Sequence, residues 1–237
     1  MFNQGSTYQR PSNSAIFGGT DPVQAYLQSF AHTAVETLAV EAARFVVVDC
    51  ETTGLNPEKD AIVSIGAIAI KAGQILLDDQ FEIMFKVTHN TASVTVHGVT
   101  REVAEQDGVE EVEALKQFLT YLQDSVIVGH HVKFDKTIIS AHCTRRFGFT
   151  LKNSCLDTMN MTLLLERSGV LPKLGVSDDF SLDSLCRRFS IAPHGRHTAG
   201  GDAFITAQIF LILLKHVRTI GICTLNELLS RAGDETH

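Results

Sequence analysis

The sequence predicts an α/β fold in which an antiparallel meander of three strands is joined to parallel strands through helical crossovers. Residues 44–50, 61–71 and 74–87 have the apolar runs or alternation of strands and are separated by short connections, which is typical of a meander. Farther along the chain, short apolar segments alternate with stretches whose apolar residues recur every three or four positions, which indicates strands followed by helices. The predicted order is β-β-β-α-β-α-β-α-α-α.

The individual elements follow from the local sequence. Residues 45–48, FVVV, form an apolar run that requires cover on both faces, so the first strand is expected inside the sheet. The second strand alternates apolar with small or polar residues, and Ala72 and Gly73 turn the chain into the third. The remaining predicted elements are the strands 125–129 and 151–156 and the helices 110–122, 132–147, 157–167, 181–189 and 199–216.

The chain is expected to contain one main domain with short additions at either end. Its 237 residues suit a single domain of ordinary to large size. Residues 1–20 are polar and rich in turn formers, whereas 21–41 have helical spacing after an Asp-Pro start. We therefore expect a tail and helical extension at 1–43, the main domain at 44–220 and a short C-terminal segment at 221–237. The extension could serve as a docking surface or as a brace.

Composition and charge favour a soluble globular protein, with 44% hydrophobic and 20% charged residues. The net charge of −7 argues against a globally basic surface for nucleic acid, but a cluster of carboxylates that binds cations is itself acidic. The five cysteines form no CxxC pair, which favours free thiols. The polar N-terminus lacks the apolar core of a signal peptide, and the longest apolar stretch, 205–214, is roughly half a membrane helix, so we expect a cytoplasmic protein.

Two acids stand at the end of the first predicted strand. Asp49 and Glu51 are two positions apart, so their side chains point to the same face of a strand. Like charges side by side are costly unless a cation neutralises them or one of them holds a proton. Thr52, Thr53 and Gly54 follow with turn chemistry, and ligands bind at such carboxyl ends of strands in α/β sheets. By itself the pair fits a ligand site and a solvated loop equally well.

Two further acids stand near the starts of helices. Asp135 falls in the first turns of the helix after the strand 125–129, and Asp202 opens the long apolar helix. A carboxylate near a helix N-terminus is favourable in any protein, so neither acid is informative alone. Together the four acids can converge on one spot, where oxygen ligands suit Mg²⁺ and two such ions can assist a phosphoryl displacement. His197, shortly before Asp202, could accept a proton there.

Three motifs carry these residues in order along the chain: DCETTG at 49–54, HHVKFD at 130–135 and HTAGGDA at 197–203. They resemble the motifs of the DEDDh 3′–5′ exonucleases, a ribonuclease H-like family that includes the proofreading (epsilon) subunit of bacterial DNA polymerase III. One departure lies in the second motif, where His130 or His131 stands near the position of a family Asn.

The resemblance implies a ribonuclease H-like fold and assigns roles to individual residues. Two divalent cations, Mg²⁺ or Mn²⁺, would be bound by Asp49, Glu51, Asp135 and Asp202. His197 would be the general base, because His194 lacks the Ala and Asp at the family offsets and is expected to be a surface residue. The expected contacts to the 3′ nucleotide are Thr52, Thr53, Leu55, His97 and Phe134.

The implied activity is hydrolysis of the terminal phosphodiester bond of a single-stranded or frayed 3′ end, with release of a nucleoside 5′-monophosphate. DNA is the favoured substrate, because the DxETTG form of the first motif resembles the polymerase-associated branch. The alternatives are an exoribonuclease that trims RNA 3′ ends, a proofreading subunit bound to a DNA polymerase, and a non-catalytic binding module. Lys133 and Arg196 are candidate contacts to the nucleic-acid backbone, whereas the Arg pairs 145–146 and 187–188 are more typical of solvated helix faces.

Overall fold

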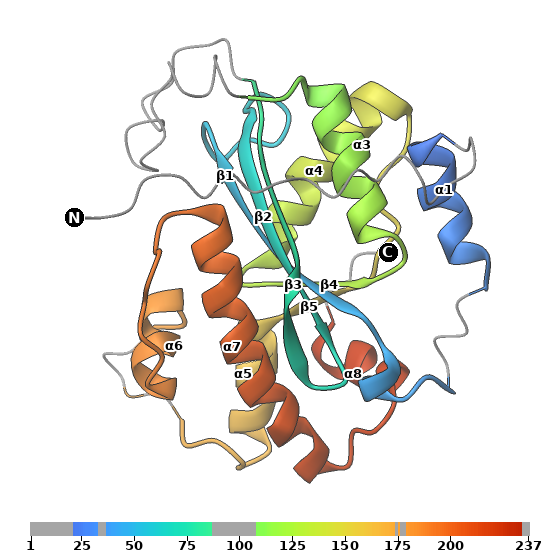
Figure 1. The fold of residues 1–237 in the computed structure, drawn as a ribbon. Coiled ribbons are helices and arrows are strands. Elements are labelled where there is room, and N and C mark those ends of the chain that lie inside the picture. Colours follow the sequence, from blue (N-terminus) through green and yellow to red (C-terminus); the bar gives the residue numbers. More distant parts are fainter. Residues whose placement is uncertain (1–20, 33–36, 87–107, 174, 176–178, 234–237) are drawn as a thin grey trace.

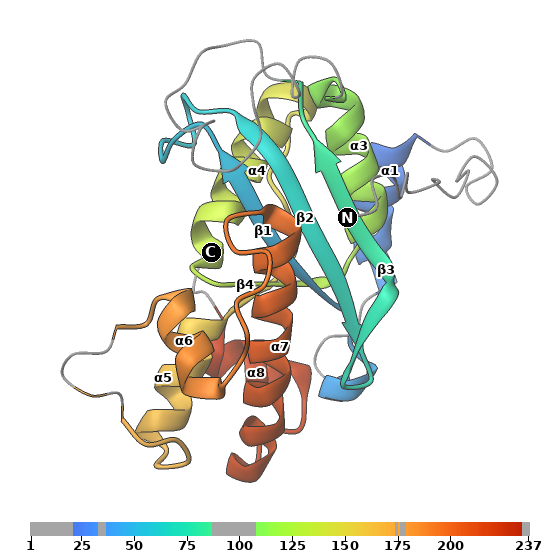
Figure 2. The same cartoon turned by 60° about the vertical axis from the view of Figure 1, so that its left-hand side comes forward.

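The computed structural model describes residues 21–32, 37–86, 108–173, 175 and 179–233, which form a five-stranded sheet with helices on both faces (Figures 1 and 2). The strands are β1 (Phe45–Thr52), β2 (Ile62–Lys71), β3 (Gln74–Met84), β4 (Val126–Gly129) and β5 (Cys155–Asp157). The α-helices are α1 (Pro22–Ser29), α3 (Glu111–Leu122), α4 (Val132–Phe147), α5 (Thr158–Arg167), α6 (Leu182–Phe189), α7 (Ala199–Val217) and α8 (Leu225–Ala232). Short 3₁₀ turns are η2 (Phe30–His32), η4 (Val40–Ala42) and η6 (Arg218–Ile220).

The sheet has the strand order β3-β2-β1-β4-β5. β1 is antiparallel to β2, and β2 is antiparallel to β3, whereas β1 with β4 and β4 with β5 run parallel. The predicted combination of an antiparallel meander with parallel crossover strands is therefore confirmed. β1 is the central strand, and its two neighbours run in opposite directions.

Two apolar cores, one on each face of the sheet, explain the apolar run in β1. Phe45 and Val47 belong to the core shared with α5, α6, α7 and α8, whereas Val46 and Val48 belong to the core shared with α1, α3 and α4. All four side chains are at most 1% exposed. Because successive side chains of a strand point to opposite faces, odd positions of β1 face α7 and even positions face α4.

β5 is shorter than the predicted strand 151–156 and begins only at Cys155. Side chains take the backbone N–H groups that a longer strand would have used. The Tyr26 hydroxyl accepts from the backbone N of Lys152 at 2.9 Å, and the Ser140 hydroxyl accepts from the backbone N of Leu151 at 3.2 Å. Since each N–H is satisfied once in this way, the ladder with β4 starts later than the sequence pattern indicates.

Both ends of the described chain pack against the main domain. α1 contacts α3, and Tyr26 is buried, with its hydroxyl donating to Asn153 at 2.7 Å. Toward the other end, Leu225 of α8 is buried in the α7-side core, and a β-bridge joins Leu156 to Gly233. The described part of the N-terminal extension therefore packs against α3 of the main domain. The domain boundaries expected from the sequence stay a prediction.

Among the described helices, α7 together with the following turn η6 (Ala199–Ile220) is long and apolar enough to cross a membrane by length and composition alone. The sequence estimate, which counted only residues 205–214, was therefore too short. The helix packs against β1 and β2, and Ile209, Phe210 and Leu213 are fully buried there. These contacts are those of the core helix of a globular domain.

Candidate active site

The acids of β1 face the first turn of α7. Asp49 and Glu51 continue the row begun by Val47, on the side of the sheet that α7 covers. In the ladder with β2, Asp49 lies opposite Gly66, and a Cβ atom at position 66 would stand 2.2 Å from the backbone N of Gly200. The absence of a side chain at Gly66 therefore lets the first turn of α7 lie directly on β2, beside Asp49.

The glycine-rich segment from Gly195 to Gly201, at the start of α7, is packed just as closely. A Cβ atom at Gly201 would lie 1.9 Å from the carbonyl oxygen of Gly195. The Thr198 hydroxyl caps the helix by accepting from the backbone N of Gly201 at 3.1 Å. Asp202 is thereby held in the first turn of α7, where the N-terminus of the helix favours a negative charge.

Asp49, Glu51 and Asp202 form a cluster, in which one oxygen of each carboxylate lies within 4.8 Å of the others. Glu51 and Asp202 are each only 7% exposed. Asp202 Oδ2 accepts from the backbone N of His197 at 3.3 Å, whereas Asp202 Oδ1 is buried and has no hydrogen-bond partner among the described residues. A buried carboxylate oxygen without a partner is costly, so this atom is placed to bind a ligand.

Asp135 reaches the same region from α4, on the other face of the sheet. It is buried, and its Oδ1 accepts from the backbone N of Cys50 at 2.9 Å. β4 pairs with β1 only over residues 45–47, so Asp135 takes an N–H of β1 beyond the end of that ladder. Asp135 therefore lies near Asp49, whose pKa its charge raises, but it is not one of the three acids whose oxygens lie within 4.8 Å of one another.

Burial and neighbouring charges raise the pKa values of Asp49, Glu51 and Asp135. Burial places the pKa of Asp49 well above its usual range, and the charges of Asp135, Asp202 and Glu51 add to the effect. Burial and then the charge of Asp202 raise the pKa of Glu51 to about 7. Burial raises the pKa of Asp135 to about 7, although hydrogen bonds from Cys50 oppose the change. Ionising the whole cluster near neutral pH therefore requires compensating positive charge.

The donor atoms fit hard divalent cations. The cluster offers carboxylate oxygens, which are the ligands that Mg²⁺ and Mn²⁺ prefer. The unpartnered Oδ1 of Asp202 supplies a ligand atom that the described protein residues leave unused. The residues present therefore fit the metal site that the sequence motifs predict.

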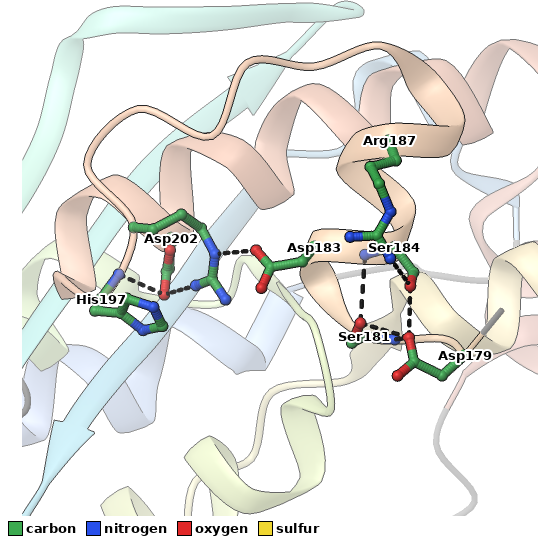
Figure 3. A network of polar contacts seen from close by, with 8 residues as sticks. Asp179, Ser181, Asp183, Ser184, Arg187, His197 and Asp202 are labelled. Carbon is green, nitrogen blue, oxygen red and sulfur yellow. Dashed lines mark hydrogen bonds and ion pairs between the residues drawn. The ribbon is translucent and has the colours of Figure 1, made fainter. Parts of the chain in front are cut away.

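Arg196 joins Asp202 to Asp183, and Figure 3 shows the side chains of these two acids. Arg196 Nη1 donates to Asp202 Oδ2, and its Nε donates to Asp183 Oδ1 at 2.7 Å. The bridge joins the start of α6 to the start of α7 and engages Oδ2 of Asp202, whereas its Oδ1 has no hydrogen-bond partner among the described residues. The Arg196 side chain is 19% exposed, and in this structure its guanidinium binds two carboxylates of the protein itself.

The N-terminus of α6 is fixed by its own network, which Figure 3 also shows. Asp179 Oδ1 accepts from the hydroxyls of Ser181 and Ser184, and Ser181 caps the helix. The expectation that the Arg pair 187–188 forms a solvated helix face was wrong for Arg188. Its side chain is largely buried in an ion pair with Glu166, because α6 packs against α5 at this point.

His197 lies beside the acid cluster. Figure 3 shows its imidazole next to Asp202, and its charge opposes the rise in the pKa of Glu51 that burial and Asp202 cause. Its backbone is left-handed, with φ of 63°, a conformation that histidine tolerates better than most residues. His194 is exposed as well, so exposure does not distinguish the two histidines.

The two threonines predicted as substrate contacts are buried and shape the loop that follows β1. The Thr52 hydroxyl donates to the carbonyl oxygen of Gly54 at 2.8 Å. The Thr53 hydroxyl donates to Asp60 Oδ1 at 3.1 Å and accepts from the backbone N of Ala61 at 2.9 Å. Their hydroxyls therefore hold the loop in shape.

The other predicted substrate contacts differ in exposure. Leu55, at the tip of the same loop, is 84% exposed, as a contact to a nucleotide base requires. Phe134 is half-buried against the α4-side core. His97 lies outside the described residues.

The sequence analysis missed Asp157, which positions α4. Its carboxylate oxygens accept from the backbone N of Val132 at 2.9 Å and of Met159 at 2.8 Å, so one acid caps both α4 and α5. His131, at the N-cap position of α4, has a left-handed backbone and makes no capping bond of its own. The signal in the sequence was an acid directly after a short apolar strand, as at Asp49.

A mixed sheet that gathers four carboxylates at the end of its central strand is the arrangement of the ribonuclease H-like nucleases. The sequence model of the exonuclease family matches residues 46–210. The chain belongs to this exonuclease family.

Sequence relatives come from bacterial replication proteins. The chain is 34% identical over 222 residues to the PolC-type DNA polymerase III of Thermotoga maritima, covering 90% of the chain and 15% of that relative. It is 30% identical over 204 residues to a DNA polymerase III subunit epsilon-like protein of Rhodobacter capsulatus, covering 84% of the chain and 27% of that relative. The chain thus spans less than a third of the length of these relatives.

Solved structures show the same fold. Exonuclease I of E. coli in complex with a dT13 oligonucleotide matches with a TM-score of 0.65 and 17% identity, over 75% of the chain and 42% of exonuclease I. At this identity the likeness establishes the fold, and the predicted ribonuclease H-like fold class is confirmed.

Proposed function

We propose that this chain is a metal-dependent 3′–5′ exonuclease that hydrolyses the terminal phosphodiester bond of single-stranded or frayed nucleic acid, preferentially DNA, and releases nucleoside 5′-monophosphates. The observation that carries the proposal is the buried Oδ1 of Asp202, which has no hydrogen-bond partner in the described part of the chain and belongs to a residue of the acid cluster. Membership of the exonuclease family supports the reaction class, and the polymerase III relatives support DNA as the substrate.

The chemistry is divided among a few side chains. Two divalent cations, Mg²⁺ or Mn²⁺, would be held by Asp49, Glu51, Asp135 and Asp202. Such cations, when bound, offset the negative charge of the phosphate and lower the pKa of water. His197 would accept the proton of the attacking water, as a histidine beside the reacting groups can do near neutral pH.

The residues 53–61, which we call the substrate loop, would receive the 3′ end. Leu55 would pack on the terminal base because it is the exposed apolar side chain of this loop, and Phe134 would contact the nucleotide from α4. Thr52 and Thr53 would contribute through the loop shape that their hydroxyls maintain. The structures of exonuclease I with dT13 and dA16 oligonucleotides support a single-stranded substrate.

A DNA polymerase subunit is the protein partner that the PolC-type and epsilon-like relatives support. Those relatives act in replication, so we place the chain in the cytoplasm. The domain boundaries at 44 and 220 are part of the same proposal.

The function is tested with 5′-labelled single-stranded DNA and RNA of one sequence, incubated with protein and Mn²⁺ or Mg²⁺ and resolved on a sequencing gel. We expect a ladder that shortens from the 3′ end, is faster on DNA, and disappears with chelator or in Asp49→Ala. A faster RNA ladder would assign the exoribonuclease alternative. If neither nucleic acid is shortened with either metal, a non-catalytic binding module replaces the proposal.

Metal binding is expected to stabilise the protein more at high pH than at low pH. In the metal-free protein, the pKa values of Glu51 and Asp135 lie near 7, above the usual value of about 4 in an unfolded chain. The folded state therefore holds extra protons, and its stability falls as the pH rises from about 5 to 8. Cations offset the repulsion, so the increase in Tm caused by saturating Mg²⁺ should be several degrees larger at pH 8 than at pH 5.5.

The control for this measurement is NaCl at matched ionic strength, which should give no such pH dependence. An equal Mg²⁺-induced change in Tm at the two pH values would contradict the placement of the cations at these acids.

A further inference from the structure

The substrate loop is organised around a single acid that does not belong to the metal cluster. Asp60 Oδ1 accepts from the Thr53 hydroxyl at 3.1 Å, and Asp60 Oδ2 accepts from the backbone N of Asn56 at 2.7 Å. The backbone N of Thr53 also donates to the carbonyl oxygen of Ala61 at 2.9 Å, which closes the loop at its base. The exposed Leu55 is therefore presented by a compact turn whose centre is Asp60.

His142 of α4 connects this turn to the helices behind it. Its Nε2 lies 3.2 Å from the backbone carbonyl oxygen of Asp60, and its Nδ1 contacts Glu111 Oε1 of α3. The imidazole is 7% exposed, so water does not substitute for these contacts. One histidine therefore links the substrate loop to α3 and α4 at once.

The two partners of His142 lie on different elements. A backbone carbonyl can only accept a hydrogen bond, so Nε2 donates to the carbonyl oxygen of Asp60. Glu111 Oε2 accepts from Arg146, and although burial favours the neutral acid, the hydrogen bonds from Arg146 and His142 lower the pKa of Glu111. Glu111 of α3 is therefore held by two side chains of α4.

Charged groups lie close to His142 on the neighbouring elements. Glu111 of α3 contacts both His142 and Arg146, one helical turn along α4. The Asp60 carboxylate is engaged within the substrate loop. None of these groups is a candidate metal ligand, so His142 can be replaced without altering the acid cluster.

We propose that His142 is a positioning residue that holds the substrate loop against α3 and α4, so that binding of the 3′ end weakens when its ring is removed. The proposal rests on the proposed function of the loop. Without the imidazole, the carbonyl oxygen of Asp60 loses its link to α4 and the loop loses its link to Glu111 of α3. Loss of one such hydrogen bond corresponds to a rise in KM of about five- to tenfold.

The kinetic test measures KM and kcat for a short single-stranded DNA at one pH. His142→Asn should raise KM while kcat changes little, because the substitution releases the loop and leaves the acid cluster in place. Glu111→Gln keeps an oxygen that can contact the imidazole, so it should raise KM less than His142→Asn. His216→Asn, at the far end of α7, should match wild type. A KM of His142→Asn equal to that of wild type would overturn the proposal.

A second measurement does not depend on activity. In ¹H–¹⁵N spectra of labelled protein, His142→Asn should shift the backbone amides of Gly54 and Leu55, whereas His216→Asn should leave them in place. If wild type cleaves no nucleic acid, the proposed function fails but these spectra still decide the role of His142. Unshifted amides in a folded His142→Asn protein would overturn its role whatever the activity.

Discussion

Replacing Asp202 with asparagine is expected to lower the rate of 3′-end hydrolysis by roughly a thousandfold or more while the protein stays folded. The substitution preserves the shape of the side chain and an oxygen that can accept from Arg196 and from the backbone N of His197. It removes the charge from a buried group whose Oδ1 has no protein partner among the described residues. Cations contribute several kcal/mol to such reactions, and each 1.4 kcal/mol is about tenfold in rate.

The measurement is single-turnover cleavage of labelled DNA, together with Tm in the absence and presence of Mg²⁺. The metal-free Tm should be unchanged or higher, because the substitution relieves repulsion with Asp49 and Glu51. The Mg²⁺-induced rise in Tm should be lost. Full activity in Asp202→Asn would contradict the assignment of the acid cluster to metal binding.

Asp183→Asn is the matched control, since it makes the same chemical change at an acid that contacts Asp202 only through Arg196. Asp183 holds Arg196, which holds Asp202, and it is not part of the acid cluster. Loss of such an outer partner is expected to reduce activity about 10- to 100-fold. Asp183→Asn should therefore be clearly milder than Asp202→Asn, and a reversed order would mean that Arg196 rather than Asp202 carries the chemistry.

The sequence sufficed for the meeting of Asp49, Glu51 and Asp202 because each acid stands at a fixed point of an element. Asp49 and Glu51 end a strand that apolar residues place in the centre of the sheet, and Asp202 lies in the first turn of a helix. Strand and helix periodicity determine the faces of such residues, and the motif spacing supplied the rest. The sequence analysis did not single out Gly66, which lies where α7 meets β2.

The outer contacts could not be predicted because they join segments that are far apart in the sequence. Nothing near His142 indicates that it meets Asp60 and Glu111, and nothing near Arg196 indicates that it meets Asp183. The short β5 has the same origin, since its missing ladder bonds are taken by Tyr26 and Ser140. Pairings of this kind depend on how elements pack, which local periodicity does not report.

His197→Ala is expected to slow cleavage by about a hundredfold or more, in line with the contribution of a positioned general base. The imidazole is exposed beside the cluster, whereas the contact of His197 with Asp202 is made by its backbone N, which alanine retains. The Mg²⁺-induced rise in Tm should therefore survive the substitution. His197→Ala should therefore lose cleavage rate but keep metal binding, whereas Asp202→Asn should lose both.

His194→Ala provides the comparison that decides between the two neighbouring histidines. Both residues lie in the loop that precedes α7, and both side chains are exposed. A general effect of altering this loop should therefore appear in either variant. A base acts through its ring on one proton and requires hydrogen-bond reach to that proton. Figure 3 places the ring of His197 beside Asp202, so His194→Ala should keep near wild-type turnover. If His194→Ala were the more damaging change, the base would be His194, and the left-handed backbone at His197 would serve only to orient Asp202.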